Sequence, residues 1–220
     1  MRPAGSRLSA APHHQANIAL GAVLAGGTSR RFGSDKAAAE FRGRTLLDHA
    51  LFALRDAGLS RLVYVGGVAR DTVPPDVVHL TDEAGVEPCM LRGVVTALEF
   101  ARQQRHARVM ILACDIPLLT AHTVTRVLAA LDDTATDVEH NTSGADISVA
   151  YGERDHWSCI AVRDTALPGL RASLNHGERA MHRATAKLRV VRVVAPGHEL
   201  TNVNDLAVLN SIADDPLLHE

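Results

Sequence analysis

The feature that most constrains this fold is an alternation of short apolar runs with segments of helical periodicity. The apolar runs are rich in Val, Ile, Leu and Ala on both faces, which is typical of strands buried on two sides. They cover residues 19–24, 62–65, 77–80, 109–113, 147–151, 159–162 and 190–194. Between them, helical spacing predicts helices over 45–57, 91–104, 120–131, 165–174 and 205–212. This order predicts a three-layer α/β fold, with a mostly parallel Rossmann-like sheet and helices on both faces.

The length of 220 residues fits one α/β domain, which we expect over residues 18–213. Residues 1–17 contain Arg2 and Arg7 but no continuous apolar stretch, so we expect a disordered leader rather than a secretory signal. The polar, turn-rich segment 132–144 predicts a surface loop, and residues 214–220 a C-terminal tail. Asn204 is expected to cap the last helix.

Composition excludes several classes of function. Lys and Arg number 23 against 25 Asp and Glu, a net charge of −2, which gives no basic surface for nucleic acid. No uncharged apolar run reaches the roughly 18–20 residues that cross a bilayer. The three cysteines lie far apart, at positions 89, 114 and 159, which favours reduced thiols over disulfides or structural zinc. We therefore expect a cytoplasmic protein that binds neither nucleic acid nor membranes. Composition does not decide the oligomeric state, for which our expectation is a monomer.

A glycine-rich segment, VLAGGTSRRFGSDK at residues 23–36, directly follows the first predicted strand. Ligands bind at such strand ends in open α/β sheets. Gly26 and Gly27 let the backbone approach a ligand, and their amides can form an anion-binding nest beside the cations Arg31 and Lys36. The spacing matches neither the dinucleotide fingerprint nor the P-loop. The alternative is a strand-to-loop connection with a solvated, Arg-rich face.

Two aspartates follow other predicted strands. Asp115 ends the apolar run VMILACD, where a carboxylate can hold Mg²⁺ together with phosphate oxygens. A turn or helix-entry aspartate is the alternative at this position. Asp82 follows the strand 77–80, and any aspartate between a strand and a loop would look the same.

Together these motifs resemble the MobA-type nucleotidyltransferases, and within them the molybdenum cofactor guanylyltransferases. The resemblance rests first on L-A-G-G-x-S-x-R-x-G-x-D-K at residues 24–36, where Phe32 replaces the usual Met. C-D-I-P at 114–117 and N-V-N at 202–204 support it. It extends from about residue 19 to residue 209, nearly the whole predicted domain.

The resemblance implies transfer of GMP from GTP to molybdopterin with release of pyrophosphate, assisted by Mg²⁺, with Mn²⁺ as an alternative. It implies catalytic roles for Lys36, Arg31 and Asp115, with Asp115 as the metal ligand. The implied nucleotide-binding residues are Leu24, Ala25, Gly26, Gly27, Lys36, Asp82 and Asp115. The implied acceptor-binding residues are His156, Arg179, Asn202 and Asn204. Molybdoenzymes or their chaperones would be the protein partners.

Two of these acceptor residues have plain structural alternatives. His156, in the segment GERDH between two predicted strands, either binds phosphate or caps the hairpin. Arg179 follows Gly177 in a G-x-R pattern that opens a helix in the family, and a solvated helix surface is its alternative role.

Two departures from the family pattern leave open which residues would contact the base of the nucleotide. Cys89-Met90 replaces the usual Gly-Pro, and Gly66-Gly67 follows the second strand where the family has Asn. The nearest alternative is the cytidylyl branch, which usually reads L-A-A-G and lacks N-V-N. A sugar-nucleotide pyrophosphorylase is a second alternative, and a non-catalytic GTP-binding protein on the same fold is a third.

Overall fold

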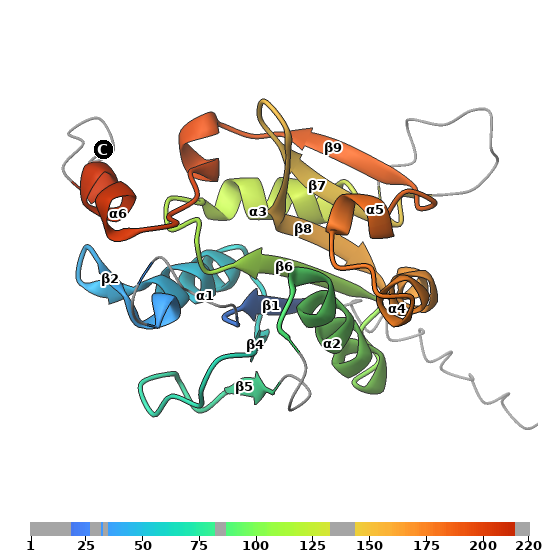
Figure 1. The fold of residues 1–220 in the computed structure, drawn as a ribbon, viewed down its shortest axis with the longest axis horizontal. Coiled ribbons are helices and arrows are strands. Elements are labelled where there is room, and N and C mark those ends of the chain that lie inside the picture. The colour runs from blue at the N-terminus through green and yellow to red at the C-terminus, as the bar shows by residue number, and fades with distance from the viewer. Residues whose placement is uncertain (1–18, 27–31, 33–34, 82–86, 133–143, 214–220) are drawn as a thin grey trace, which may run out of the picture.

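The structure is a computed structural model that describes residues 19–26, 32, 35–81, 87–132 and 144–213. Within these residues the main sheet has seven strands in the order β5-β4-β1-β6-β8-β7-β9 (Figure 1). They are β1 (Leu20–Leu24), β4 (Arg61–Val65), β5 (Val77–Leu80), β6 (Arg108–Ala113), β7 (Ile147–Tyr151), β8 (Asp155–Arg163) and β9 (Val190–Val194). Neighbouring strands pair in parallel, except that β8 is antiparallel to both β6 and β7. The predicted mostly parallel sheet is therefore confirmed.

Each predicted helix is present, with ends shifted by one or two residues. The helices are α1 (Leu46–Asp56), α2 (Met90–Gln103), α3 (Ala121–Ala129), α4 (Leu167–Asn175) and α6 (Leu206–Ala213), together with the unpredicted α5 (Met181–Ala184). Three 3₁₀ turns were not predicted either, η1 (Lys36–Ala38), η2 (Asp164–Ala166) and η3 (Gly197–Leu200). A small hairpin of β2 (Glu40–Phe41) and β3 (Arg44–Thr45) was also not predicted.

Helices cover both faces of the sheet, which makes the expected three layers. Buried residues of α1, α3 and α6 form one core cluster, and those of α2, α4 and α5 form the other. Strand β1 serves both clusters, because successive side chains point to opposite faces of a sheet. Its Leu20, Ala22 and Leu24 pack with α2, whereas Val23 packs with α1. Figure 1 shows α2 and α4 in front of the sheet and α3 behind it.

Two local predictions from the sequence are wrong. Strand β8 begins at Asp155, so His156 belongs to the strand, where it pairs with Ala150 at a bulge. The segment Gly177-Glu178-Arg179 does not open a helix, because α5 begins only at Met181. Instead the Glu178 carboxylate accepts hydrogen bonds from the amides of Arg179 and Ala180.

Three further predictions concern residues that lie wholly or mostly outside the described part of the chain. The predicted leader (residues 1–17) and tail (214–220) lie outside the described residues, as does most of the predicted loop 132–144. In the part that is described, no helix is both long enough and apolar enough to span a membrane.

The packing of β1 against its neighbours makes a stability prediction at Gly21. A Cβ atom there would lie 2.5 Å from Leu62 Cδ2, 3.2 Å from Leu54 Cδ1 and 3.4 Å from Leu59 Cδ2. Gly21→Ala should therefore lower the free energy of unfolding by about 1–3 kcal/mol, the usual cost of overpacking a core. Urea denaturation measures this change.

Gly169→Ala is the matched control. Gly169 lies in α4, and the nearest atom to its added Cβ would be Leu188 Cδ2 at 3.8 Å. Alanine favours a helix over glycine by up to ~1 kcal/mol, so this variant should be neutral or stabilised. Equal effects of the two substitutions would contradict the packing argument.

Candidate active site

The site begins where β1 ends, at Ala25 and Gly26. The amides of both residues donate to the carbonyl of Val65, at 2.9 and 3.1 Å, so the loop is fastened to the end of β4. The Gly26 amide is therefore hydrogen-bonded within the chain, and its contact with phosphate stays a prediction. Gly27 and Arg31, the other loop residues expected to contact phosphate, lie outside the described residues.

Gly66 and Gly67, the departure from the family pattern, lie directly against this loop. Both have positive φ, 76° and 69°, which glycine adopts without the strain that a side chain brings. A Cβ on Gly67 would lie 3.1 Å from the carbonyl oxygen of Ala25. The two glycines thus allow a close contact between the backbones that follow β4 and β1.

Lys36 is held at the start of the 3₁₀ turn η1. The side chain of Asp35 caps this turn by accepting from the Ala37 amide at 3.1 Å. Arg70 holds Asp35 from the other side with an ion pair of 2.6 Å, and the Arg70 side chain is only 11% exposed. Nothing in the sequence indicated Arg70, because the pair spans 35 positions along the chain.

Lys36 and Asp115 meet across the ends of the strands. The Lys36 ammonium lies 3.2 Å from Asp115 Oδ2, and the two side chains are only 16% and 18% exposed. The same ammonium lies 3.5 Å from Asn204 Oδ1. Two other predicted site residues from distant parts of the chain therefore contact the positive charge of Lys36.

The N-V-N segment runs beside Asp115. The Val203 amide donates to the Asp115 carbonyl at 2.7 Å, and the Val203 side chain is fully buried. Asn204 does not cap α6 as expected. Asp205 does so, because its Oδ1 accepts from the Val208 amide at 2.9 Å. This leaves the Asn204 side chain available for its contact with Lys36.

Two side-chain oxygens at this place are buried without a partner. Asp115 Oδ1 and Asn202 Oδ1 have no hydrogen bond within the described part of the chain. Buried polar atoms are nearly always satisfied in folded proteins, so each of these orphaned oxygens points to a missing group. Carboxylate and amide oxygens are ligands that hard cations prefer, so these residues fit a divalent cation. The described residues contain no cluster of three or more His, Cys, Asp or Glu, so other oxygens would have to come from the ligand.

Cys114 precedes Asp115 but is not a nucleophile at neutral pH. Burial raises the pKa of its thiol to about 12, and the neighbouring Asp115 carboxylate adds to the shift. The thiolate is the reactive form of cysteine, so the thiol stays inert. Cys89, Cys114 and Cys159 are all free, as expected from the sequence.

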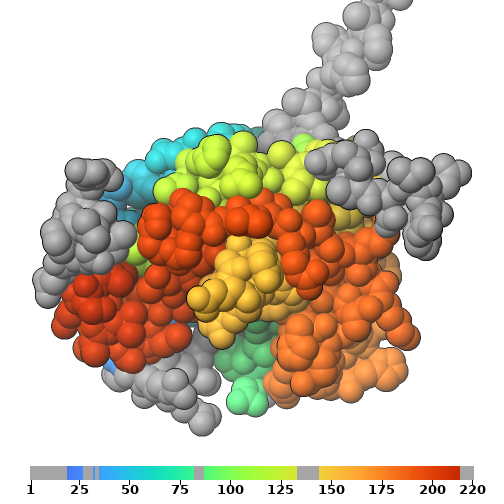
Figure 2. Space-filling view, turned by 90° about the horizontal axis from the view of Figure 1, so that it is seen from above, coloured from blue at the N-terminus to red at the C-terminus, as the bar shows by residue number. Residues whose placement is uncertain are grey.

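His156 and Arg179 have contacts separate from the Lys36 group. Burial and the neighbouring Arg154 lower the pKa of His156 from its usual value, which favours the neutral imidazole. It lies by the turn between β7 and β8, near Gly152, whose added Cβ would touch both His156 and Leu200. Figure 2 shows this turn, in yellow, beside the red segment that contains η3.

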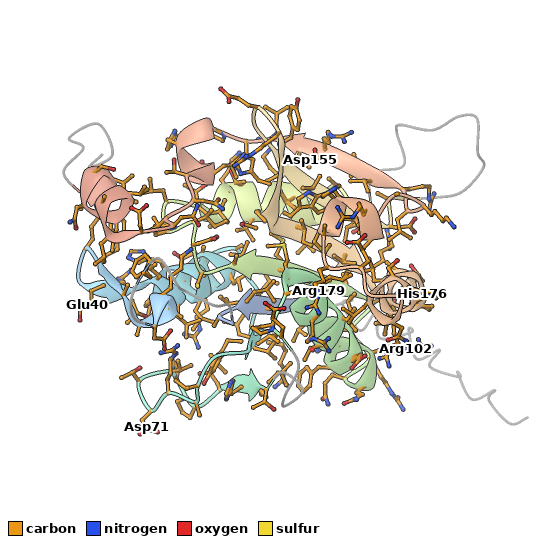
Figure 3. All side chains as sticks on the ribbon, viewed as in Figure 1. Glu40, Asp71, Arg102, Asp155, His176 and Arg179 are labelled. Carbon is orange, nitrogen blue, oxygen red and sulfur yellow. The ribbon has the colours of Figure 1, made fainter. Side chains whose placement is uncertain are left out.

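Arg179 lies over the N-terminal end of α2 (Figure 3). Its Nη1 is 3.4 Å from the Glu87 carbonyl and 3.8 Å from the Glu87 carboxylate, and its side chain is half exposed. Its contacts therefore link the 177–179 turn to the segment before α2. Asp82 lies outside the described residues.

Comparison with known proteins agrees with this arrangement. The chain matches the MobA-like NTP transferase domain over residues 21–193. A protein from Opitutus terrae named probable molybdenum cofactor guanylyltransferase is 33% identical over 184 residues, which cover 82% of this chain and 85% of that protein.

Two solved structures share the fold. A nucleotidyl transferase from Methanothermobacter has a TM-score of 0.69 at 18% identity, covering 90% of this chain and 97% of that one. Molybdopterin-guanine dinucleotide biosynthesis protein A from Archaeoglobus fulgidus has a TM-score of 0.64 at 18% identity, covering 89% and 97%. The predicted fold and family resemblance are confirmed: the chain belongs to the MobA-like NTP transferase family and is a nucleotidyltransferase.

Proposed function

We propose that this nucleotidyltransferase transfers GMP from GTP to molybdopterin and releases pyrophosphate. The observation that carries the proposal is the pair between Lys36 of η1 and Asp115, which follows β6, with Asn204 beside it. The name of the Opitutus terrae relative supports guanine as the base and the molybdenum cofactor as the acceptor.

Lys36 neutralises charge on the triphosphate. Its ammonium pairs with Asp115, and both side chains are largely shielded from water. A triphosphate that enters this place offers Lys36 a stronger acceptor, because ionised phosphate oxygens form short, charge-assisted hydrogen bonds. Lys36 then stabilises negative charge that grows on the leaving pyrophosphate.

Asp115 and Asn202 would hold a divalent cation, Mg²⁺ or Mn²⁺, through their unpartnered oxygens. When bound, the cation supplies Lewis-acid stabilisation of the phosphate oxygens. If Lys36 moves to the phosphate, Asp115 Oδ2 would lose its partner and would be available beside Oδ1. One residue pair would thus serve both the empty and the loaded site.

The reaction needs positioned reactants rather than a protein nucleophile. An oxygen of the acceptor phosphate attacks the α-phosphorus of GTP, a new P–O bond forms, and the bond to the β-phosphate oxygen breaks. The acceptor phosphate is largely ionised at pH 7, because its second pKa is about 6. No general base is required, so the chain contributes alignment and charge.

His156, Arg179, Asn202 and Asn204 are proposed to bind the acceptor. The neutral imidazole, which the lowered pKa of His156 favours, would donate one hydrogen bond to a phosphate oxygen. Asn204 lies next to Lys36 and would contact the acceptor close to the reacting phosphorus.

The base and the activity are tested by pyrophosphate release with Mg²⁺ and a molybdopterin acceptor, with GTP and CTP in parallel. We expect release with GTP and little with CTP. Release with CTP alone would move the protein to the cytidylyl branch. If GTP binds by calorimetry and neither nucleotide gives pyrophosphate, the chain is a non-catalytic GTP-binding protein and the proposal fails.

Lys36 and Lys187 are the two lysines of the chain, which provides a matched pair of variants. Lys36→Ala should lower kcat by roughly 100- to 1000-fold, the usual loss when one preorganised charge-stabilising group is removed. Lys187 is exposed, and Lys187→Ala should leave kcat unchanged. Lys36→Arg should not restore the rate, because a planar guanidinium does not replace a compact ammonium. Comparable rates for Lys36→Ala and wild type would remove Lys36 from the mechanism.

A further inference from the structure

Glu199 is a buried charged side chain to which the reaction assigns no role. Among the described residues it is the only Asp, Glu, Lys or Arg that is buried, with 5% of its surface exposed. A buried carboxylate is costly unless it is hydrogen-bonded. Glu199 Oε2 accepts two hydrogen bonds from Thr120, from the amide at 3.0 Å and from Oγ1 at 2.9 Å.

These hydrogen bonds join the two segments that form the site. Thr120 ends the loop that begins at Asp115, and Glu199 lies in η3, just before the N-V-N segment. At the other end, the Val203 amide donates to the Asp115 carbonyl at 2.7 Å. The segments 115–120 and 199–203 therefore run side by side in opposite directions, with a link at each end. In Figure 1, η3 lies next to the start of α3.

The link matters because the N-V-N segment has no regular secondary structure of its own. Its position depends on the Val203 link, on the buried side chains of Leu200 and Val203, and on Glu199. Asn202 and Asn204 flank Val203, so a shift of this segment would move both amides away from Asp115 and Lys36.

The carboxylate of Glu199 lies at the N-terminal end of α3, where a negative charge is favourable. Thr120 is the N-cap of α3, and its Oγ1 accepts from the Thr123 amide at 3.4 Å while it donates to Glu199. The first amides of a helix carry partial positive charge, which favours a carboxylate at that end. Glu199 thus combines charge-assisted hydrogen bonds with the field of α3.

We propose that Glu199 is a positioning residue, which clamps the N-V-N segment against the Asp115 loop through Thr120. The inference rests on the proposed function for its kinetic consequence. The clamp itself is a property of the empty protein and is tested without substrate.

Hydrogen exchange of the substrate-free protein tests the clamp directly. Glu199→Ala removes the acceptor and should increase exchange of the Val203 amide and of the peptide that contains residues 201–204. Glu199→Gln keeps an oxygen that accepts from Thr120 and should restore most of the protection. If Glu199→Ala does not fold, Thr120→Val, which removes the hydroxyl that donates to Glu199 and also caps α3, is the second variant and should raise exchange in the same peptide.

Ser148→Ala is the matched control. Buried Ser148 donates from Oγ to the carbonyl of Val127 in α3, at 2.5 Å, so its loss loosens α3 without touching Thr120. This variant should leave exchange at 201–204 unchanged. Equal exchange at 201–204 in Glu199→Ala and wild type would overturn the clamp.

Turnover tests the consequence for the reaction. Glu199→Ala should lower kcat by roughly 10- to 100-fold, because small misplacements of a positioning group have effects of this size. The KM for GTP should change less, and Glu199→Gln should recover much of the rate. If the kcat of Glu199→Ala equals the kcat of Ser148→Ala, the positioning role is refuted. If the wild type transfers no nucleotide, the proposed function fails, and the exchange experiment still decides on the clamp.

Discussion

The arrangement of the site depends on the parallel pairing of β1 with both of its neighbours. Leu24, the last residue of β1, lies in register with Val65 of β4 and with Ala113 of β6. Three strands therefore end at the same level, and the segments that follow them must meet there. These segments are Ala25-Gly26 after β1, the Gly66-Gly67 turn after β4 and Asp115 after β6. Residues far apart in sequence become neighbours because backbone hydrogen bonds align the strands that carry them.

The meeting point is organised around a single ammonium group. Lys36 contacts Asp115 and Asn204. Other hydrogen bonds position the segments that carry these three residues. Lys36 sits on a turn capped by Asp35, and Arg70 holds that cap in place. Asp115 and the N-V-N segment are fastened to each other by the Val203 amide. The backbone segments that carry the unpartnered oxygens of Asp115 and Asn202 are thus joined to each other, which suits catalysis by positioning and charge.

Much of the fold could be predicted, because apolar runs and helical spacing are local signals. The strands at 77–80, 147–151 and 190–194 have the predicted bounds. Strand β8 starts earlier than predicted, because pairing with β7 recruits the polar residues Asp155 and His156, which have no apolar pattern.

The site was predictable only in part. Motifs located Lys36 and Asp115, but not the contact between them, which spans 79 positions. The sequence does not show whether Asn204 or Asp205 caps α6, because Asn and Asp are equally good capping residues. In the structure Asp205 is the cap. Glu199 and Arg70 gave no signal, because a single charged residue reveals its partner only when the chain has folded.

The most direct test of the account is a crystal structure with Mn²⁺ and a non-hydrolysable GTP analogue, with the metal located by its anomalous scattering. The account predicts a peak coordinated by Asp115 Oδ1 and Asn202 Oδ1, and a Lys36 ammonium that has left Asp115 for a phosphate oxygen. A metal bound elsewhere, with the Lys36–Asp115 pair intact beside a bound nucleotide, would contradict it.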